Sequence, residues 1–134
     1  MKKYSLFFAF IAIIALSVTS CSNSDSTNPG TNPNIIGKWM GVYTPPLGPS
    51  RYYALTFNTN GTVMVEQNNS TTPDIANGTW TISGNNIQAT YTFTGSMTGT
   101  FSIAGTYSSA PLQITGTIGT GSSTSGYGTF TVSK

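Results

Sequence analysis

Residues able to carry acid–base, nucleophilic or metal chemistry are few in this sequence. Its 134 residues include no histidine and one cysteine, Cys21, and the acidic residues are Asp25, Glu66 and Asp74. Acid–base hydrolysis needs a positioned pair of titratable groups, and a serine nucleophile needs a base beside it. Transition metals would lack their usual ligands. We therefore expect no enzymatic activity, no catalytic residue, no cofactor and no metal site.

The two acidic residues of the C-terminal region are not expected to act together. Glu66 is placed near the end of an expected strand, whereas Asp74 follows Pro73 in an expected loop over residues 68–76. Calcium at this Asn- and Asp-containing loop would have a single carboxylate ligand, which is weak for a calcium site. A solvated connector is the preferred interpretation of the loop.

The lone cysteine follows the features of an export signal. Lys2 and Lys3 form a basic start, and residues 6–16 are an apolar run without charge, shorter than the roughly 20 residues that span a membrane. The segment Val18-Thr19-Ser20-Cys21 resembles the lipobox of bacterial lipoproteins, whose cysteine is acylated and becomes the new N-terminus. The resemblance implies a signal peptide over residues 1–20 and palmitate-type lipid attachment at Cys21. An ordinary signal peptide that leaves a free thiol is the alternative.

Residues 21–34 are expected to form a disordered tether between the anchor and a folded domain. They are polar and contain no apolar side chain large enough to seed a core. In the lipoprotein sorting systems that this region resembles, an Asp directly after the cysteine retains the protein at the inner membrane. Here that position is Ser22, so the resemblance implies a bacterial outer membrane, on its periplasmic or cell-surface face.

The charged residues of the remaining chain are balanced. Lys38, Arg51 and Lys134 oppose the three acidic residues once the signal segment is set aside. Nucleic-acid binding depends on Lys and Arg side chains that neutralise phosphates. We therefore expect no nucleic-acid partner, and attachment to the membrane through the N-terminal lipid anchor rather than through a basic surface.

From residue 35 onward the pattern is that of an all-β domain covering residues 35–134. Short segments rich in Thr, Tyr, Phe, Ile and Val alternate with Gly, Asn, Ser and Pro, and Asn60-Gly61 is a strong hairpin signal. An eight-stranded antiparallel up-and-down barrel is the expected fold, because closure removes exposed sheet edges. A two-sheet β-sandwich is the alternative. The expected strands are residues 35–43, 51–59, 62–67, 78–82, 86–94, 97–107, 112–118 and 126–134.

Alternation places many aromatic side chains inside such a barrel, and two interiors are consistent with this pattern. Eight strands enclose a space that their own side chains can fill. Alternatively, small residues of the same parity leave a ligand-sized pocket. The small residues in question are Gly41, Ala89, Gly105, Gly116 and Gly128.

Two short motifs carry a resemblance to a barrel family. Gly37-Lys38-Trp39 begins the first expected strand, and Gly78-Thr79-Trp80 begins the fourth. The first motif resembles the Gly-x-Trp of lipocalin-like barrels, in which the Trp closes one end and a basic residue of the last strand covers it. The resemblance implies barrel closure at Trp39, with Lys134 over its ring in a cation–π contact.

The leading functional expectation is a non-catalytic, lipid-anchored envelope protein whose lipocalin-like barrel binds a small apolar or amphipathic ligand. The alternative is a module that presents the loops at residues 44–50 and 68–76 to a protein or glycan, with Pro45, Pro46 and Pro49 stiffening the first loop. The expected ligand-binding residues, placed nearer the end away from Trp39, are Tyr43, Tyr53, Phe57, Tyr91, Phe93 and Tyr107.

Overall fold

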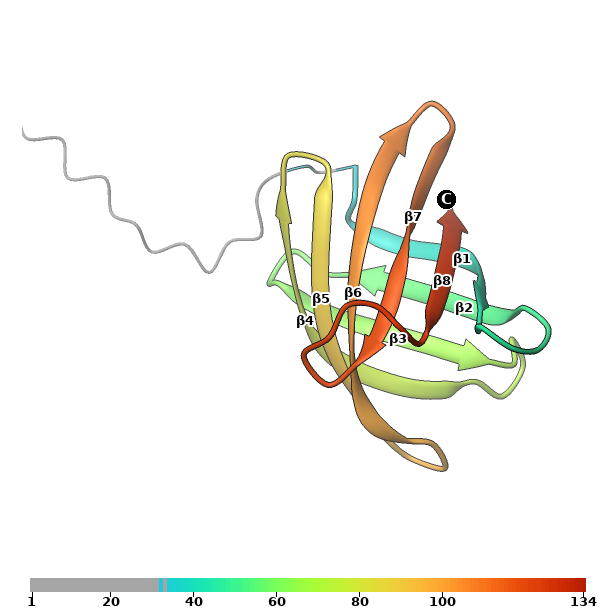
Figure 1. Ribbon diagram of the computed structural model, residues 1–134. Coiled ribbons are helices and arrows are strands. Elements are labelled where there is room, and N and C mark those ends of the chain that lie inside the picture. Colours follow the sequence, from blue (N-terminus) through green and yellow to red (C-terminus); the bar gives the residue numbers. More distant parts are fainter. Residues whose placement is uncertain (1–31, 33) are drawn as a thin grey trace, which may run out of the picture.

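The computed structural model describes Asn32 and residues 34–134, which form a closed barrel of eight antiparallel strands (Figure 1). The expected signal peptide, Cys21 and nearly all of the expected tether lie outside the described residues. The strands are β1 (Gly37–Thr44), β2 (Arg51–Phe57), β3 (Thr62–Asn68), β4 (Asp74–Ser83), β5 (Asn86–Thr94), β6 (Thr98–Ser109), β7 (Leu112–Thr120) and β8 (Gly128–Ser133).

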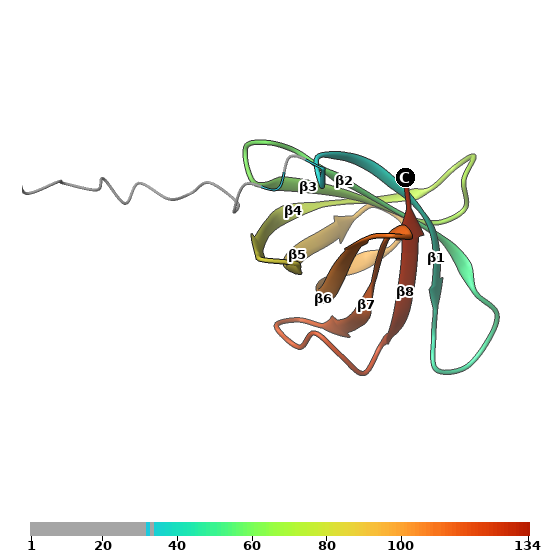
Figure 2. The same ribbon diagram turned by 90° about the horizontal axis from the view of Figure 1, so that it is seen from above.

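The barrel closes through the pairing of its first and last strands, which confirms the barrel and excludes the sandwich. Each strand pairs with the next along the chain, and β1 also pairs antiparallel with β8, with Gly41 opposite Val132 (Figure 2). Side chains alternate between the interior and the solvent, most regularly in β5. Among the described residues there is no helix long and apolar enough to cross a membrane.

Four strand starts differ from the expectation, those of β1, β4, β6 and β8. β1 begins at Gly37 because Ile35 lies in a turn, where its backbone N–H donates to the carbonyl of Asn32 over 3.0 Å. β4 begins at Asp74, so the loop expected over residues 68–76 is shorter than predicted. Polar composition indicated a loop there, but cross-strand pairing of Glu66 with Ile75 extends the sheet through it. Tertiary pairing has overridden weak β propensity.

Two of the interior small residues, Gly105 and Gly116, do not leave the space that their size indicated. Gly105, Gly116 and Phe130 are cross-strand neighbours in one row. A Cβ added at Gly116 would lie 2.7 Å from the Phe130 ring, and one added at Gly105 would lie 3.0 Å from it. The ring of Phe130 therefore covers both glycines. Aromatic side chains commonly shield strand glycines in this way.

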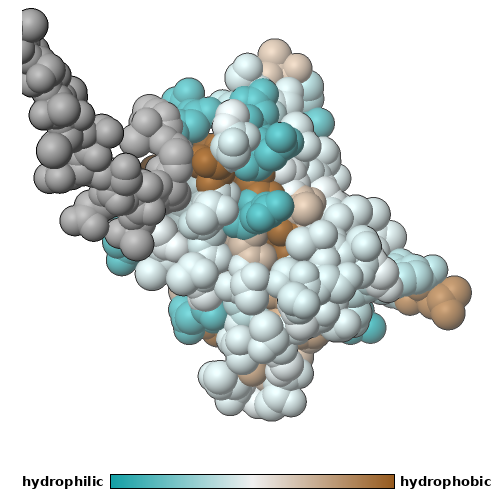
Figure 3. All heavy atoms as spheres, turned by 60° about the vertical axis from the view of Figure 1, so that its left-hand side comes forward, coloured by the Kyte–Doolittle hydropathy of each residue, from teal (hydrophilic) through white to brown (hydrophobic). Residues whose placement is uncertain are grey.

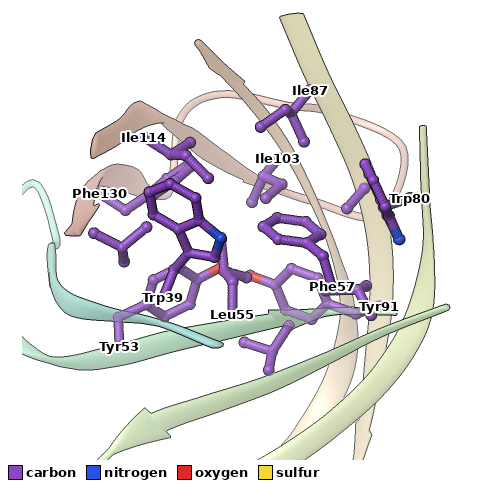
Figure 4. Close-up of a cluster of buried hydrophobic side chains, with 14 of the residues drawn as sticks. Trp39, Tyr53, Leu55, Phe57, Trp80, Ile87, Tyr91, Ile103, Ile114 and Phe130 are labelled. Carbon is purple, nitrogen blue, oxygen red and sulfur yellow. The ribbon is translucent and has the colours of Figure 1, made fainter. Parts of the chain in front are cut away.

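Aromatic and aliphatic side chains pack the middle of the barrel (Figure 4). The ring centroids of Phe57 and Trp80 are 4.9 Å apart, and those of Tyr53 and Phe130 are 5.6 Å apart. These distances are typical of aromatic side chains in direct contact. Of the two interiors left open by the sequence, the structure shows the packed one in this region.

Candidate functional site

One end of the barrel, the Trp39 end, is sealed by hydrogen bonds to backbone. The indole Nε1 of Trp39 donates to the carbonyl of Ile35 over 2.7 Å, and the Trp39 side chain is completely buried. The ammonium of Lys134 lies 5.5 Å from the centre of the Trp39 ring and donates to the carbonyls of Ile36 and Asn34. The expected cation–π contact is thus confirmed, and it joins the chain's last residue to the start of β1.

The six expected ligand-binding residues are all buried, but they lie at both ends of the barrel. Tyr107 packs edge-on against Trp39 at 6.0 Å, and Phe57 is paired with Gly37. Placing these two nearer the opposite end was wrong. The reason is that parity shows which face a side chain occupies, but not its height along the barrel axis. The structure brings the other four together away from Trp39: Tyr43, Tyr53, Tyr91 and Phe93.

The hydroxyl groups of Tyr53 and Tyr91 share a 2.9 Å hydrogen bond inside the barrel, where their oxygens face each other (Figure 4). Burial raises the pKa of both phenols, and the neighbouring Tyr91 raises that of Tyr53 further. Both are therefore neutral hydrogen-bonding groups at physiological pH. They form the polar floor of the site described next.

The opposite end of the barrel, which we call the Tyr127 end, is covered by side chains from loops. Tyr127, in the connection between β7 and β8, and Met97, between β5 and β6, are partly buried and pack against the core. The Tyr127 ring stacks on Tyr43 at 6.1 Å with an interplanar angle of 11°, and its centroid lies 4.8 Å from that of Phe101. Burial and the neighbouring Tyr43 raise the pKa of the Tyr127 phenol.

Sequence analysis missed Tyr127 because residues 126–134 were expected to be one continuous strand. In such a strand Tyr127 would point outward, opposite to Phe130. β8 instead begins at Gly128, so Tyr127 lies outside the strand and does not follow its alternation of inward and outward side chains. Gly126 adopts a φ of +96°, a conformation accessible to glycine, and thereby lets the chain turn Tyr127 over the barrel.

Gln67 is a second residue of this end that sequence analysis did not select. It shares the inward parity of Val63 and Val65 and is 2% exposed, and its register partner on β2 is Tyr53. Its side-chain Nε2 is buried and has no hydrogen-bond partner. A buried polar group without a partner costs about 1–3 kcal/mol, so such groups call for an explanation. The alternation of inward and outward side chains along β3 was the sequence signal that could have identified Gln67.

The Gln67→Met substitution is expected to stabilise the protein by about 1 kcal/mol, because an apolar side chain of similar length removes the desolvated amide. Urea unfolding monitored by tryptophan fluorescence measures the change. Gln88→Met, at an exposed position of β5, is the matched control and should stay within about 0.5 kcal/mol of the wild type. A loss of stability in Gln67→Met alone would show that the amide is satisfied.

The two acidic residues of the barrel, Glu66 and Asp74, lie in different places and make different contacts. Glu66 lies outside, bound at 2.6 Å by the ammonium of Lys38 and at 2.8 Å by the hydroxyl of Tyr52. Burial raises the pKa of Glu66, but these two hydrogen bonds outweigh that effect and lower it. Asp74 accepts hydrogen bonds from the side chains of Asn68 and Ser96 at the Tyr127 end. Within the described part of the chain, no three His, Cys, Asp or Glu residues cluster as metal ligands.

Hollows open to solvent lie at the surface of the described part of the chain. One of 320 Å³ is bounded by Asp74, Ile75, Ser96 and Met97 at the Tyr127 end. Another, of 330 Å³, crosses the outer faces of β5, β6 and β7, and a smaller one of 150 Å³ lies over β4 and β5. The face in Figure 3 is mostly pale, as expected where Thr, Ser and Gly dominate. Such a face offers few charges to a partner.

The two ends of the barrel therefore differ in how they are closed. Hydrogen bonds from side chains to backbone carbonyls close the Trp39 end, whereas loop side chains cover a group of tyrosine hydroxyls and one unpaired amide at the other end.

A scan against protein-family models found no matching family, and searches of curated proteins and of solved structures found no match. The site is thus defined by its own geometry, within an eight-stranded antiparallel barrel consistent with a lipocalin-like fold.

Proposed function

We propose that this chain is a non-catalytic, lipid-anchored protein of the bacterial envelope whose barrel binds a small amphipathic molecule at the Tyr127 end. The observation that carries the proposal is the loop residue Tyr127 lying over a group of buried tyrosines. An apolar pocket with a few convergent polar groups is the usual form of a small-molecule site. Moving one loop side chain would admit a ligand without breaking the sheet.

Of the expected ligand-binding residues, four fit this position. Tyr43 lies directly beneath Tyr127, and Tyr53 and Tyr91 present their hydroxyls below it. Phe93 contacts Tyr91 at 5.8 Å. Phe57 and Tyr107 would support the site from the Trp39 end rather than touch the ligand.

The anchor is the second element of the proposal, and it is supported by the lipobox-like segment that ends at Cys21. Two acyl chains suffice for stable attachment to a membrane. Expression of Cys21→Ser in a Gram-negative host should abolish incorporation of labelled palmitate and release the protein from the outer-membrane fraction. Retention of both label and fractionation would contradict the anchor and leave the ligand proposal intact.

A second function, the loop-presenting interaction module, is favoured by one observation. Leu47, in the loop between β1 and β2, is 91% exposed, and three prolines flank it. An exposed apolar side chain on a stiff loop is cheap to immobilise on a partner. The loop between β3 and β4, also named in this hypothesis, is reduced to residues 69–73.

Native mass spectrometry of the full chain in detergent, after incubation with envelope extract, tests the ligand proposal. We expect a bound species of small-molecule mass in the wild type and equally in Leu47→Ser, because the Leu47 side chain is 91% exposed and is not part of the buried tyrosine group. A macromolecular adduct that disappears in Leu47→Ser would favour the interaction module. The free mass alone in both proteins would contradict the ligand proposal.

A further inference from the structure

At the Tyr127 end, the space between two core aromatic rings is filled by the ring of Tyr127, a residue that lies outside the strands. The Tyr127 ring lies between Tyr43, on which it stacks, and Phe101, 4.8 Å away. Its backbone N–H donates to the carbonyl of Ile118 over 2.9 Å, but Gly126 precedes it with a φ of +96°. Another planar ring placed there would meet the same two aromatic faces.

The same end of the barrel contains a hydrogen-bond donor without a partner, the side-chain amide of Gln67. The Gln67 amide is 2% exposed, lies on the inward face of β3 opposite Tyr53, and its Nε2 has no partner. Tyr53 and Tyr91 use their hydroxyls on each other. An oxygen acceptor brought by a ligand would therefore satisfy the group that the protein itself leaves unpaired.

The rim of this end carries a cation, Arg51, that forms no direct salt bridge within the described residues, although Asn68 links it to the carboxylate of Asp74. Arg51 is the first residue of β2, and its side chain makes a single 3.5 Å hydrogen bond to Asn68. The salt bridge within the described part of the chain is formed by Lys38 and Glu66, on the outside of the barrel. A ligand oxygen with negative charge would be attracted by Arg51 and repelled by Asp74 on the same rim, so the position of the oxygen relative to these two groups decides the sign of the effect.

We infer that the ligand is a small aromatic molecule bearing a carbonyl or carboxylate oxygen. Its ring takes the place of the Tyr127 ring between Tyr43 and Phe101, and its oxygen accepts a hydrogen bond from Gln67 Nε2. This inference rests on the proposed function, which requires only that some amphipathic molecule binds at this end. It goes further by naming the two groups that the ligand must contain.

Side-chain amide resonances of glutamine test the inference, because the chain contains only three glutamines, Gln67, Gln88 and Gln113. The full chain, labelled with ¹⁵N at the glutamine side chains and held in lipid nanodiscs, is titrated with benzamide, benzoate and toluene. We expect the Gln67 signal to shift with the two oxygen-bearing probes, while the Gln88 and Gln113 signals stay in place. Toluene should bind about tenfold more weakly, the factor expected for one lost hydrogen bond.

The variant Gln67→Met supplies the second measurement. Saturation-transfer NMR should show that benzamide and toluene bind it equally, because only the amide contact is lost. Equal binding of all three probes to the wild type would overturn the inference and leave the proposed function standing. Failure of every probe to shift the Gln67 signal, or equal shifts at all three glutamines, would overturn the inference as well. The proposed function then depends on the extract experiment alone.

Discussion

Replacing Trp39 with alanine is expected to lower the free energy of unfolding by about 3–5 kcal/mol, the range found for large aromatic side chains in protein cores. Its side chain is fully buried at the end of the barrel where β1 begins. The substitution removes three things together: the packed ring, the hydrogen bond to Ile35 and the surface on which Lys134 lies. The Trp39 end should therefore open when the indole is lost.

Urea unfolding followed by far-ultraviolet circular dichroism measures the effect. Met40→Ala is the matched control, since the neighbouring side chain on β1 is 53% exposed and should change stability by about 0.5 kcal/mol or less. If the two variants proved equally stable, Trp39 would not be the residue that closes this end. Lys134→Met should produce only a small loss, because a cation–π contact contributes about 0.5–2 kcal/mol.

Gly78→Ala is expected to lower the free energy of unfolding by about 3 kcal/mol, at the upper end of the usual cost of overpacking. A Cβ at this position would overlap the carbonyl oxygen of Thr90 and lie 2.6 Å from the Cα of Tyr91. Both are backbone atoms of the paired strand β5, so no side chain can move aside. The β4–β5 pairing would have to shift.

Gly95→Ala provides the control for this prediction. A Cβ there meets nothing within 4 Å, and the residue lies in the short connection between β5 and β6. Its stability should remain within about 0.5 kcal/mol of the wild type. Comparable losses in both variants would mean that chain flexibility, rather than close approach of the strands, explains the glycines.

The all-β class and the number of strands could be predicted because each depends on a local signal, whereas closure of the barrel was preferred over a sandwich because it removes exposed sheet edges. Strict alternation in residues 86–94 gave β5 with its observed bounds, and Asn60-Gly61 marked a hairpin. Parity at Lys134 and the Gly-x-Trp motif at Trp39 predicted a contact between residues at opposite ends of the domain. These features follow from which face each side chain occupies.

What the sequence could not show depends on neighbours across the sheet. The start of β4 at Asp74 is fixed by pairing with β3, not by the polar residues themselves. The space beside Gly105 and Gly116 is filled by Phe130, whose reach over both strands appears only once the register is known. The height of Phe57 and Tyr107 along the barrel was misplaced for the same reason.

The residues of the candidate site could be predicted from the sequence in part. Tyr43, Tyr53, Tyr91 and Phe93 were predicted as lining residues from parity and aromatic character, and they lie together. Tyr127 was not predicted, because a loop residue follows no alternation. Gln67 has inward parity that could have been noticed, but an unpaired amide becomes visible only when its surroundings are known.

Mapping of tyrosine signals tests the central claim, that a small molecule binds at the Tyr127 end, most directly. The full chain labelled with ¹⁵N at tyrosine, in nanodiscs, is compared by NMR before and after incubation with small molecules extracted from the envelope. We expect the signals of Tyr43, Tyr53, Tyr91 and Tyr127 to move, while Tyr107 beside Trp39 and the outer-face Tyr52 stay in place. Unchanged spectra, or shifts centred on Tyr107 or Tyr52, would contradict it.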